Sequence, residues 1–443
     1  MKAGFVSLGC AKNLVDTEVM LGIMRAHGID ITDNPADADI LIVNTCAFIL
    51  SAKEESITTV LNLAEYETNR CKALIVAGCL GQLYRRELLD EMPEVDAIVG
   101  TGAWNRIMEA IEEALSGRRV VLIGEREIIC DAKTPRIRTT PSYTAYVKIA
   151  EGCNNRCAFC TIPLIRGRQI SRTIEDIRAE VVRLAADGVK EVNLIAQDTT
   201  AYGVDIYGKP KLVELLRELV TTDVQWIRIL YAYPRRFTDE LIDIIAAEPK
   251  ICNYVDLPLQ HASNKILKLM NRPDTRESIE ALLTKIRARI PDVAIRSTFI
   301  VGFPGETDDD FAELKNFLRT WRLDKVGVFT YSREEDTPAY DLPDQNSEQV
   351  MQERYHDLMS VQSQISQELN EQQVGREIDV LVETRDEEVS AVVAGRSYRD
   401  APEVDGLVYI ENDTRSKAGD IVRAQVTAGF VYDLAAERVD SFD

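Results

Sequence analysis

Three cysteines lie within eight residues of one another, at Cys153, Cys157 and Cys160. Gaps of three and two residues let three thiolates wrap one cubane iron–sulfur cluster and leave one iron without a protein ligand. An iron with an open position can bind a cofactor or substrate directly. A structural zinc ion is the alternative, but a closed zinc site requires four protein ligands, which usually come as two pairs. No further Cys or His lies within a few residues, so the spacing favours an iron–sulfur cluster.

A second set of cysteines, Cys10, Cys46 and Cys79, lies in the N-terminal part of the chain. Each follows a short apolar run that predicts a buried parallel strand: Gly4–Leu8, Ile40–Val43 and Ala73–Ala77. The carboxyl ends of such strands lie along one edge of a sheet, where ligands bind. The three thiols could therefore meet and hold a second cluster with an open iron. Three independent buried thiols are the alternative, since free Cys packs as a small apolar residue.

The remaining cysteines fit neither pattern and are interpreted as ordinary thiols: Cys71, Cys130 and Cys252. A further strand is expected at Ala97–Val99. Helices are expected between the N-terminal strands: Leu14–His27, Ala52–Tyr66 and Trp104–Leu115. Residues 1–117 are thus predicted to form a doubly wound parallel α/β domain. Residues 118–142 are rich in Pro and Arg and are interpreted as a linker.

Residues 143–370 again alternate strand and helix. Six strands are expected: Tyr143–Ile149, Glu191–Ala196, Trp226–Tyr231, Tyr254–Leu257, Ile295–Val301 and Val326–Tyr331. Right-handed crossovers would curl six βα units into a partial barrel with one open side. The loop with Cys153 follows the first of these strands, at the end where such barrels do chemistry.

Residues 371–443 change to short alternating strands with polar connections. The expected strands are Ile378–Val382, Val389–Ala394, Leu407–Ile410 and Ile421–Val426. This pattern predicts a small antiparallel β-barrel of the OB type.

The cysteine spacing after the first strand of a βα barrel resembles the radical S-adenosylmethionine superfamily. Two three-cysteine sets in this order, followed by a small barrel, resemble its methylthiotransferase family over essentially the whole chain, with the small barrel as a TRAM domain. Four stretches resemble the branch that modifies ribosomal protein S twelve: Leu8–Asp16, Asn44–Ile49, Ala196–Gly203 and Gly395–Ser397. The six expected cysteines are all present.

This resemblance implies two 4Fe–4S clusters, one on each cysteine set, together with S-adenosylmethionine. It implies addition of a methylthio group to the β-carbon of an aspartate in ribosomal protein S twelve. One S-adenosylmethionine would supply the radical and another the methyl group, with electrons from a donor such as flavodoxin or ferredoxin. The alternative is the same chemistry on a tRNA adenosine.

The resemblance also suggests contacts to S-adenosylmethionine. Gln197 and Asp198 follow the second barrel strand, where the superfamily usually places a polar motif that binds the amino group; a turn and helix cap is the alternative. Gly302 and Gly305 could let the backbone approach the adenosine, although a tight turn explains them equally well. No catalytic acid or base is identified.

Two arginines, Arg166 and Arg168, follow the core cysteine loop. They could face anionic groups of the cofactor or of the substrate. Placement on the surface is the alternative.

The net charge of the chain indicates which kind of macromolecule it binds. The chain has a net charge of −21, which disfavours indiscriminate binding of nucleic acid. Residues 371–443 hold 17 acidic and 8 basic side chains, a net charge of 8 − 17 = −9. An acidic barrel favours a basic ribosomal protein over tRNA, with a merely solvated acidic face as the alternative. The chain lacks a long apolar run and its start does not resemble a signal peptide, so no membrane contact and a cytoplasmic location are expected.

Overall fold

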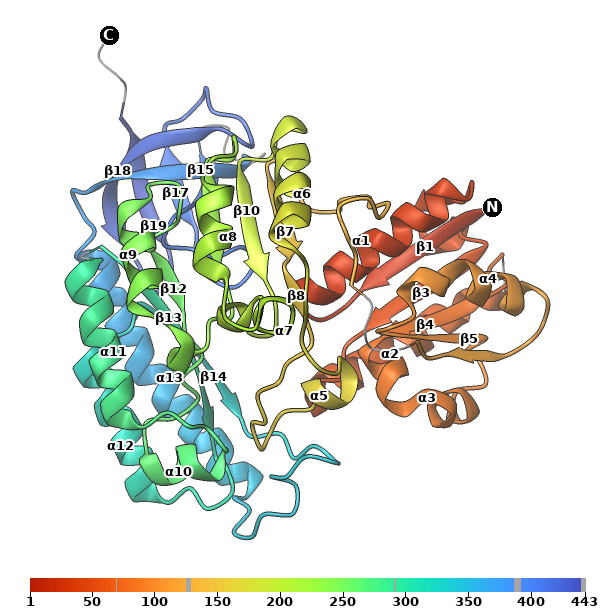
Figure 1. Ribbon diagram of the computed structural model, residues 1–443, viewed down its shortest axis with the longest axis horizontal. Coiled ribbons are helices and arrows are strands. Elements are labelled where there is room, and N and C mark those ends of the chain that lie inside the picture. Colours follow the sequence, from red (N-terminus) through yellow and green to blue (C-terminus); the bar gives the residue numbers. More distant parts are fainter. Residues whose placement is uncertain (69, 125–128, 291, 386–391, 440–443) are drawn as a thin grey trace.

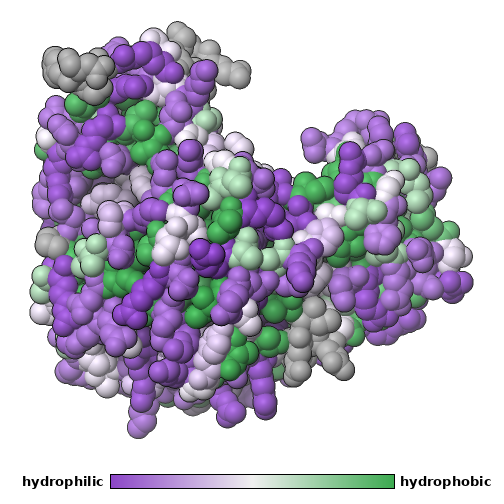
Figure 2. Space-filling model, turned by 45° about the horizontal axis from the view of Figure 1, so that its top comes forward, coloured by the Kyte–Doolittle hydropathy of each residue, from purple (hydrophilic) through white to green (hydrophobic). Residues whose placement is uncertain are grey.

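The computed structural model describes residues 1–443 apart from 69, 125–128, 291, 386–391 and 440–443. Three regions follow one another along the chain (Figure 1): an N-terminal sheet flanked by helices, a central arc of strands backed by helices, and a C-terminal barrel. The N-terminal region forms a separate lobe at the right of the space-filling view, with a notch between it and the C-terminal barrel (Figure 2). Within the described residues, no helix is long and apolar enough to cross a membrane.

The N-terminal sheet is parallel, in the order β2-β1-β3-β4-β5-β6. Its strands are β1 Lys2–Ser7, β2 Asp30–Thr32, β3 Ile40–Thr45, β4 Leu74–Gly78, β5 Ala97–Gly100 and β6 Val120–Leu122. Its helices are α1 Ala11–Ala26, α2 Leu50–Ala64, α3 Cys79–Glu91 and α4 Ile107–Leu115, with 3-10 turns η1 Pro35–Asp37, η2 Glu65–Thr68 and η3 Trp104–Arg106. Alternate strand residues pack on α1 and α4 on one face and on α2 and α3 on the other. The predicted doubly wound sheet is confirmed.

Two edge strands of this sheet, β2 and β6, were not expected from the sequence. Each has three residues and is only partly buried, so neither gives a recognisable apolar run. β6 pairs with β5, and it lies inside the segment 118–142 that the sequence interprets as a linker. The N-terminal sheet therefore continues beyond residue 117.

The central region contains the six expected strands: β7 Thr144–Lys148, β10 Glu191–Ile195, β11 Trp226–Ile229, β12 Tyr254–Asp256, β13 Ala294–Val301 and β14 Lys325–Thr330. They form two three-stranded parallel sheets, β7-β10-β11 and β12-β13-β14. A parallel bridge between Ile227 and Ile251 joins the two sheets into one arc. The short strands β8 Ala150–Glu151 and β9 Ile170–Ser171 pair beside the cysteine loop.

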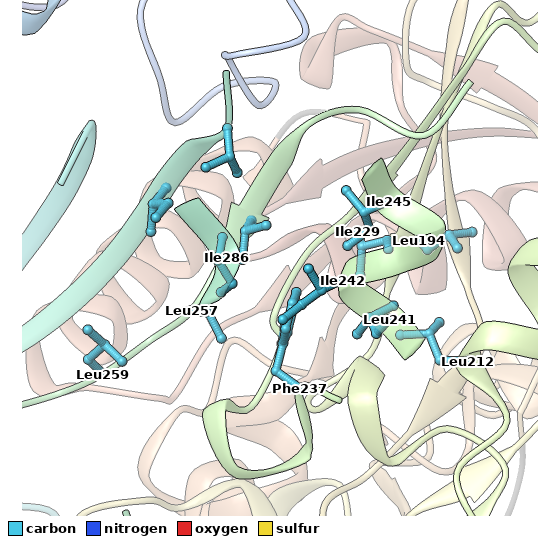
Figure 3. Packing of buried hydrophobic residues seen from close by; sticks show 14 of the residues in the cluster. Leu194, Leu212, Ile229, Phe237, Leu241, Ile242, Ile245, Leu257, Leu259 and Ile286 are labelled. Carbon is cyan, nitrogen blue, oxygen red and sulfur yellow. The ribbon is translucent and has the colours of Figure 1, made fainter. Parts of the chain in front are cut away.

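The helices of the central region are α5 Ile162–Ile165, α6 Ile174–Ala186, α7 Val204–Tyr207, α8 Leu212–Leu219, α9 Asp239–Ala247, α10 Asn264–Leu269, α11 Arg276–Arg289, α12 Asp308–Trp321 and α13 Glu348–Glu371, with turns η4 Thr199–Ala201 and η5 Pro234–Arg236. The longer helices cover the outer face of the arc. Residues in or directly after the strands, such as Leu194, Ile229 and Leu257, pack there among Leu241, Ile242 and other buried side chains (Figure 3). This continuous core fixes the strand ends that carry the site.

The C-terminal barrel is closed, in the order β15-β16-β17-β19-β18. Its strands are β15 Glu377–Arg385, β16 Val393–Ser397, β17 Val408–Glu411, β18 Ile421–Gly429 and β19 Leu434–Arg438. Most pairs are antiparallel, and one parallel pair, β17 with β19, closes the barrel. β19 was not expected because its residues, Leu-Ala-Ala-Glu-Arg, favour helix locally. Part of the predicted strand Val389–Ala394 lies outside the described residues.

The barrel is fixed to the central arc by a buried ionic cluster. Glu191 of β10 accepts hydrogen bonds from Arg228 Nε (3.0 Å) and from Arg396 Nη2 (2.6 Å), and all three side chains are at most 1% exposed. Because Arg228 belongs to β11 and Arg396 to β16, one carboxylate joins the central strands to the barrel.

Candidate functional site

The N-terminal cysteines lie at the carboxyl ends of three neighbouring strands, as the sequence predicts. Cys10 precedes α1, Cys46 follows β3, and Cys79 begins α3. Gly9 has a left-handed φ of +90°, and a Cβ there would lie only 3.2 Å from Cys46 Sγ. The first two cysteine loops therefore touch. Cys10 is exposed, Cys46 is partly exposed and Cys79 is buried.

Asn13 holds these loops together from the first turn of α1. Its Nδ2 donates to the carbonyls of Leu8 (3.0 Å) and Thr45 (2.9 Å), and the thiol of Cys79 lies 3.4 Å from its Oδ1. One side chain thus contacts the loops after β1 and β3 and the start of α3. Sequence analysis identified the stretch that contains Asn13 but not this role.

Cationic side chains surround the N-terminal thiols. Desolvation by the surrounding protein opposes ionisation of the Cys10 thiol, but the positive charges of Lys12 and Arg166 outweigh it and lower the pKa of this thiol. Burial raises the pKa of Cys46, and it raises that of Cys79 to about 12. A coordinated metal deprotonates such thiols outright, so these shifts do not oppose a cluster.

The core cysteines lie in the loop between β8 and α5, at the carboxyl end of the central strands. The backbone N–H of Cys153 donates to Gly167 O (3.1 Å), and that of Ala158 donates to Met270 O (2.9 Å). Asn271 Nδ2 donates to Arg156 O (2.5 Å). These hydrogen bonds therefore connect the loop to the segment after α5, at Gly167, and to the end of α10.

All three core thiols are partly exposed, which leaves them accessible to a cluster. Burial raises the pKa of Cys153 to about 11 and that of Cys160 to about 12. Among the described residues, no group of three or more Cys, His, Asp or Glu side chains converges to hold a single metal ion. A cubane takes each thiolate on a different iron, so a set of three thiols would leave its fourth iron without a protein ligand.

Gln197 lies beside the core cysteine loop. Its Nε2 donates to Glu151 Oε1 (2.6 Å). In the described part of the chain its Oε1 is buried without a partner, as are Gln260 Oε1 and the hydroxyl of Tyr331. These side chains follow β10, β12 and β14, at the same end of the arc. Orphaned polar atoms there fit a polar cofactor, and sequence analysis missed Gln260 and Tyr331.

Asp198 has a different setting from Gln197. Its carboxylate accepts from Asn155 Nδ2 (2.8 Å) in the cysteine loop, from Arg236 (2.7 Å) and from the backbone of Ala201 (3.1 Å). Asp198 caps η4 and ties the cysteine loop to the strand ends. Direct contact between Asp198 and S-adenosylmethionine stays a prediction.

The two glycines also have local roles. Gly302 and Gly305 both have left-handed φ values, +72° and +79°. A Cβ at position 302 would lie 2.2 Å from Met351 Cγ of α13, and one at 305 would lie 3.1 Å from Leu269 Cδ1. The turn and its packing therefore account for both residues, and their predicted contact with adenosine stays a prediction.

A buried polar network lies between the two cysteine sites. Lys148 Nζ contacts Asp16 and Glu151, and Arg166 donates to the same two carboxylates. Asp16 belongs to α1, while the other three residues belong to the central region. One sign was present in the sequence, because a lysine inside an otherwise buried strand is rarely placed there without a partner. The network could not be assembled from sequence because its members are far apart along the chain.

Three known families match this chain. They are the radical SAM superfamily over residues 147–318, the uncharacterized protein family UPF0004 over residues 2–100, and the TRAM domain over residues 374–439. In structure, the chain resembles the radical S-adenosylmethionine methyltransferase TsrM from Kitasatospora setae, with a TM-score of 0.57 and 15% identity over 87% of this chain and 79% of that one. This likeness supports the fold. The fold and the core cysteine loop define a radical S-adenosylmethionine enzyme, a class that uses a 4Fe–4S cluster.

The particular family follows from sequence relatives. The chain is 51% identical over 437 residues to the ribosomal protein uS12 methylthiotransferase RimO of Desulforamulus reducens, covering 98% of both chains. It is 49% identical to RimO of Myxococcus xanthus over 99% of this chain and 92% of that relative. RimO of Geobacter sulfurreducens is 50% identical over 98% of both chains. This chain belongs to the RimO family of methylthiotransferases.

Proposed function

We propose that this enzyme adds a methylthio group to the β-carbon of an aspartate in ribosomal protein uS12. The observation that carries the proposal is that the chain has two separate three-cysteine sites with one buried polar network between them. Each site leaves one iron of a cubane open. Family membership supports the substrate, since the relatives are named as uS12 methylthiotransferases.

The two cysteine sets would hold two 4Fe–4S clusters: Cys153, Cys157 and Cys160 in the core, and Cys10, Cys46 and Cys79 in the N-terminal lobe. The core cluster with S-adenosylmethionine supplies the radical chemistry. Gln197, Gln260 and Tyr331 would bind the polar groups of S-adenosylmethionine through their orphaned atoms. Asp198 would hold the cysteine loop through Asn155.

Surface charge supports a basic protein as substrate. The segment 371–443 has a net charge of −9, and two of its arginines, Arg396 and Arg399, are buried against the central region. Two of its aspartates, Asp400 and Asp413, are buried as well, so these buried residues leave the acidic excess of the segment unchanged. Such a surface attracts a Lys- and Arg-rich ribosomal protein and repels the phosphates of tRNA.

The junction beside the N-terminal cysteine site is also acidic. Leu50 N donates to Ser332 Oγ (3.1 Å), and Lys53 pairs with Glu334, so α2 and the segment after β14 lie side by side. The exposed carboxylates in these two segments include Glu54, Glu55, Glu335, Asp336 and Asp341, against one exposed arginine, Arg333. A basic substrate segment that enters here meets favourable charge.

An anaerobic product assay tests this proposal. Reconstituted enzyme with S-adenosylmethionine and a reductant, such as reduced flavodoxin or ferredoxin, is offered either a uS12 peptide spanning the target aspartate or isopentenyl-adenosine tRNA. We expect a methylthio mass gain on the peptide alone. A gain on tRNA alone would assign the alternative substrate and contradict the interpretation of the acidic surface.

A further inference from the structure

Arg166 belongs to the central region but its side chain points into the N-terminal lobe. It follows α5, which begins two residues after Cys160, and it is 2% exposed. The hydroxyl of Thr101 donates to Ile165 O (2.8 Å), so the lobe also contacts the backbone just before Arg166. The sequence left open whether this arginine faces the site or the surface, and the structure places it inside.

The two terminal nitrogens of the Arg166 guanidinium, Nη1 and Nη2, have different partners. Nη2 donates to Asn13 Oδ1 and lies 3.7 Å from Cys79 Sγ. Nη1 donates to Asp16 Oδ2 (3.0 Å) and Glu151 Oε2 (2.8 Å). The planar fork therefore spans from an N-terminal cysteine to the carboxylates of the network.

The network holds this fork in place. Lys148 and Arg166 supply two cations, and Asp16 and Glu151 supply two carboxylates, all at least 90% buried at the side chain. Because the charges balance, the arginine stays fully charged in a dry interior. Within the described residues, Lys148 Nζ donates to the two carboxylates, whereas Arg166 also donates to the thiol of Cys79.

We propose that Arg166 is a positioning residue that the radical core contributes to the N-terminal cluster, where it raises the reduction potential of that cluster by donating to Cys79. This inference rests on the proposed function, which places a cluster on Cys10, Cys46 and Cys79. Reduction adds a negative charge to the cluster, and a buried cation beside a ligating sulfur stabilises the reduced form. The radical core would then set part of the electrostatic environment of the N-terminal cluster alone.

Redox titration of the isolated N-terminal cluster tests the proposal. The full-length variant Cys153→Ala/Cys157→Ala/Cys160→Ala removes the core ligands, and the remaining cluster is titrated anaerobically with electron paramagnetic resonance as the readout. In this background we expect Arg166→Gln to lower the midpoint potential. Arg166→Lys keeps the charge but cannot span both partners, so it should give a smaller shift in the same direction.

Three controls separate this role from a general effect on folding. Arg168→Gln removes the same charge two residues away, at an exposed position, and should leave the potential unchanged. The double variant Arg166→Gln/Glu151→Gln keeps the buried charges balanced and should still lower the potential. In the background Cys10→Ala/Cys46→Ala/Cys79→Ala, Arg166→Gln should leave the potential of the core cluster unchanged.

Shifts in Arg166→Gln and Arg166→Lys no larger than that of Arg168→Gln would overturn the inference. Equal shifts of both clusters would also overturn it. If the core-cysteine variant binds no iron at all, the two-cluster proposal itself fails and this inference fails with it.

Discussion

The core cysteine site comes from one loop of eight residues, whereas the N-terminal site is assembled from three strand ends spread over seventy residues. The core loop is tied mainly to its own neighbourhood and to α10. The N-terminal site depends on Asn13, on sheet register and on an arginine from another region. A local motif therefore defines the core site, whereas the N-terminal site forms only when three strands pair and the lobe meets the central region.

Removing one cysteine set at a time should give the largest difference in activity between the two sites. Cys153→Ala/Cys157→Ala/Cys160→Ala should abolish both 5′-deoxyadenosine and methylthio product, because the cluster that cleaves S-adenosylmethionine is lost. Cys10→Ala/Cys46→Ala/Cys79→Ala should still form 5′-deoxyadenosine but give no methylthio product. Liquid chromatography with mass spectrometry measures both products. Equal loss of 5′-deoxyadenosine in the two variants would contradict separate roles.

The N-terminal lobe is attached to the core through a buried carboxylate. Glu18 of α1 accepts from Arg136 Nε (2.8 Å) and from the backbone of Thr139 (2.6 Å), and its side chain is fully buried. Glu18→Ala leaves the buried Arg136 with Glu180 (2.8 Å) as its one remaining carboxylate, which Arg172 shares, so we expect a loss of about 3 kcal/mol in the free energy of unfolding.

Urea titration measures this loss, with exposed Glu55→Ala as the control, expected within about 0.5 kcal/mol of wild type. The N-terminal cluster should also be lost at a lower urea concentration than the core cluster. Simultaneous loss of the two clusters would show that the lobe does not open separately.

Glu191, the carboxylate that joins the core to the C-terminal barrel, should make a contribution to stability that depends on pH. Burial raises the pKa of Glu191, but Arg396 and Arg228 outweigh it and lower the value to about 2. A lowered pKa gives stability that is present above the ordinary value of 4.5 and is lost as pH falls toward 2. This contribution is roughly 3 kcal/mol, at about 1.4 kcal/mol per pKa unit.

Urea titrations of the cluster-free protein between about pH 6 and pH 2 measure the contribution of Glu191 to the free energy of unfolding. The difference in stability between wild type and Glu191→Gln should shrink as pH falls through this range. A constant difference would show that Glu191 does not titrate with a lowered pKa.

The Lys53–Glu334 pair should have the smallest effect. It joins α2 to the segment after β14, with side chains 12% and 2% exposed. Ser332 Oγ also donates to Glu334 (2.6 Å), so the carboxylate keeps one partner when the lysine is removed. Lys53→Met should cost about 1–3 kcal/mol in the free energy of unfolding, measured by thermal denaturation, because a buried carboxylate loses its cation but keeps the serine hydroxyl. A loss above about 3 kcal/mol would mean that this contact holds the lobe in place.

The same contrast explains what the sequence could predict. The core loop, the six barrel strands and the parallel N-terminal sheet follow from spacing and apolar runs, because these signals are local. Edge strands β2 and β6 are too short to give such runs, and β19 has a helical composition. The roles of Asn13, Lys148 and Arg166 come from contacts between regions, which spacing along the chain does not encode.

The most direct test of the two-site account is the iron and acid-labile sulfide content per chain after anaerobic reconstitution. We expect about eight of each in the wild-type protein and about four in each triple cysteine variant. Zinc without sulfide, or about four irons in the wild type that all disappear with the core cysteines, would contradict the account.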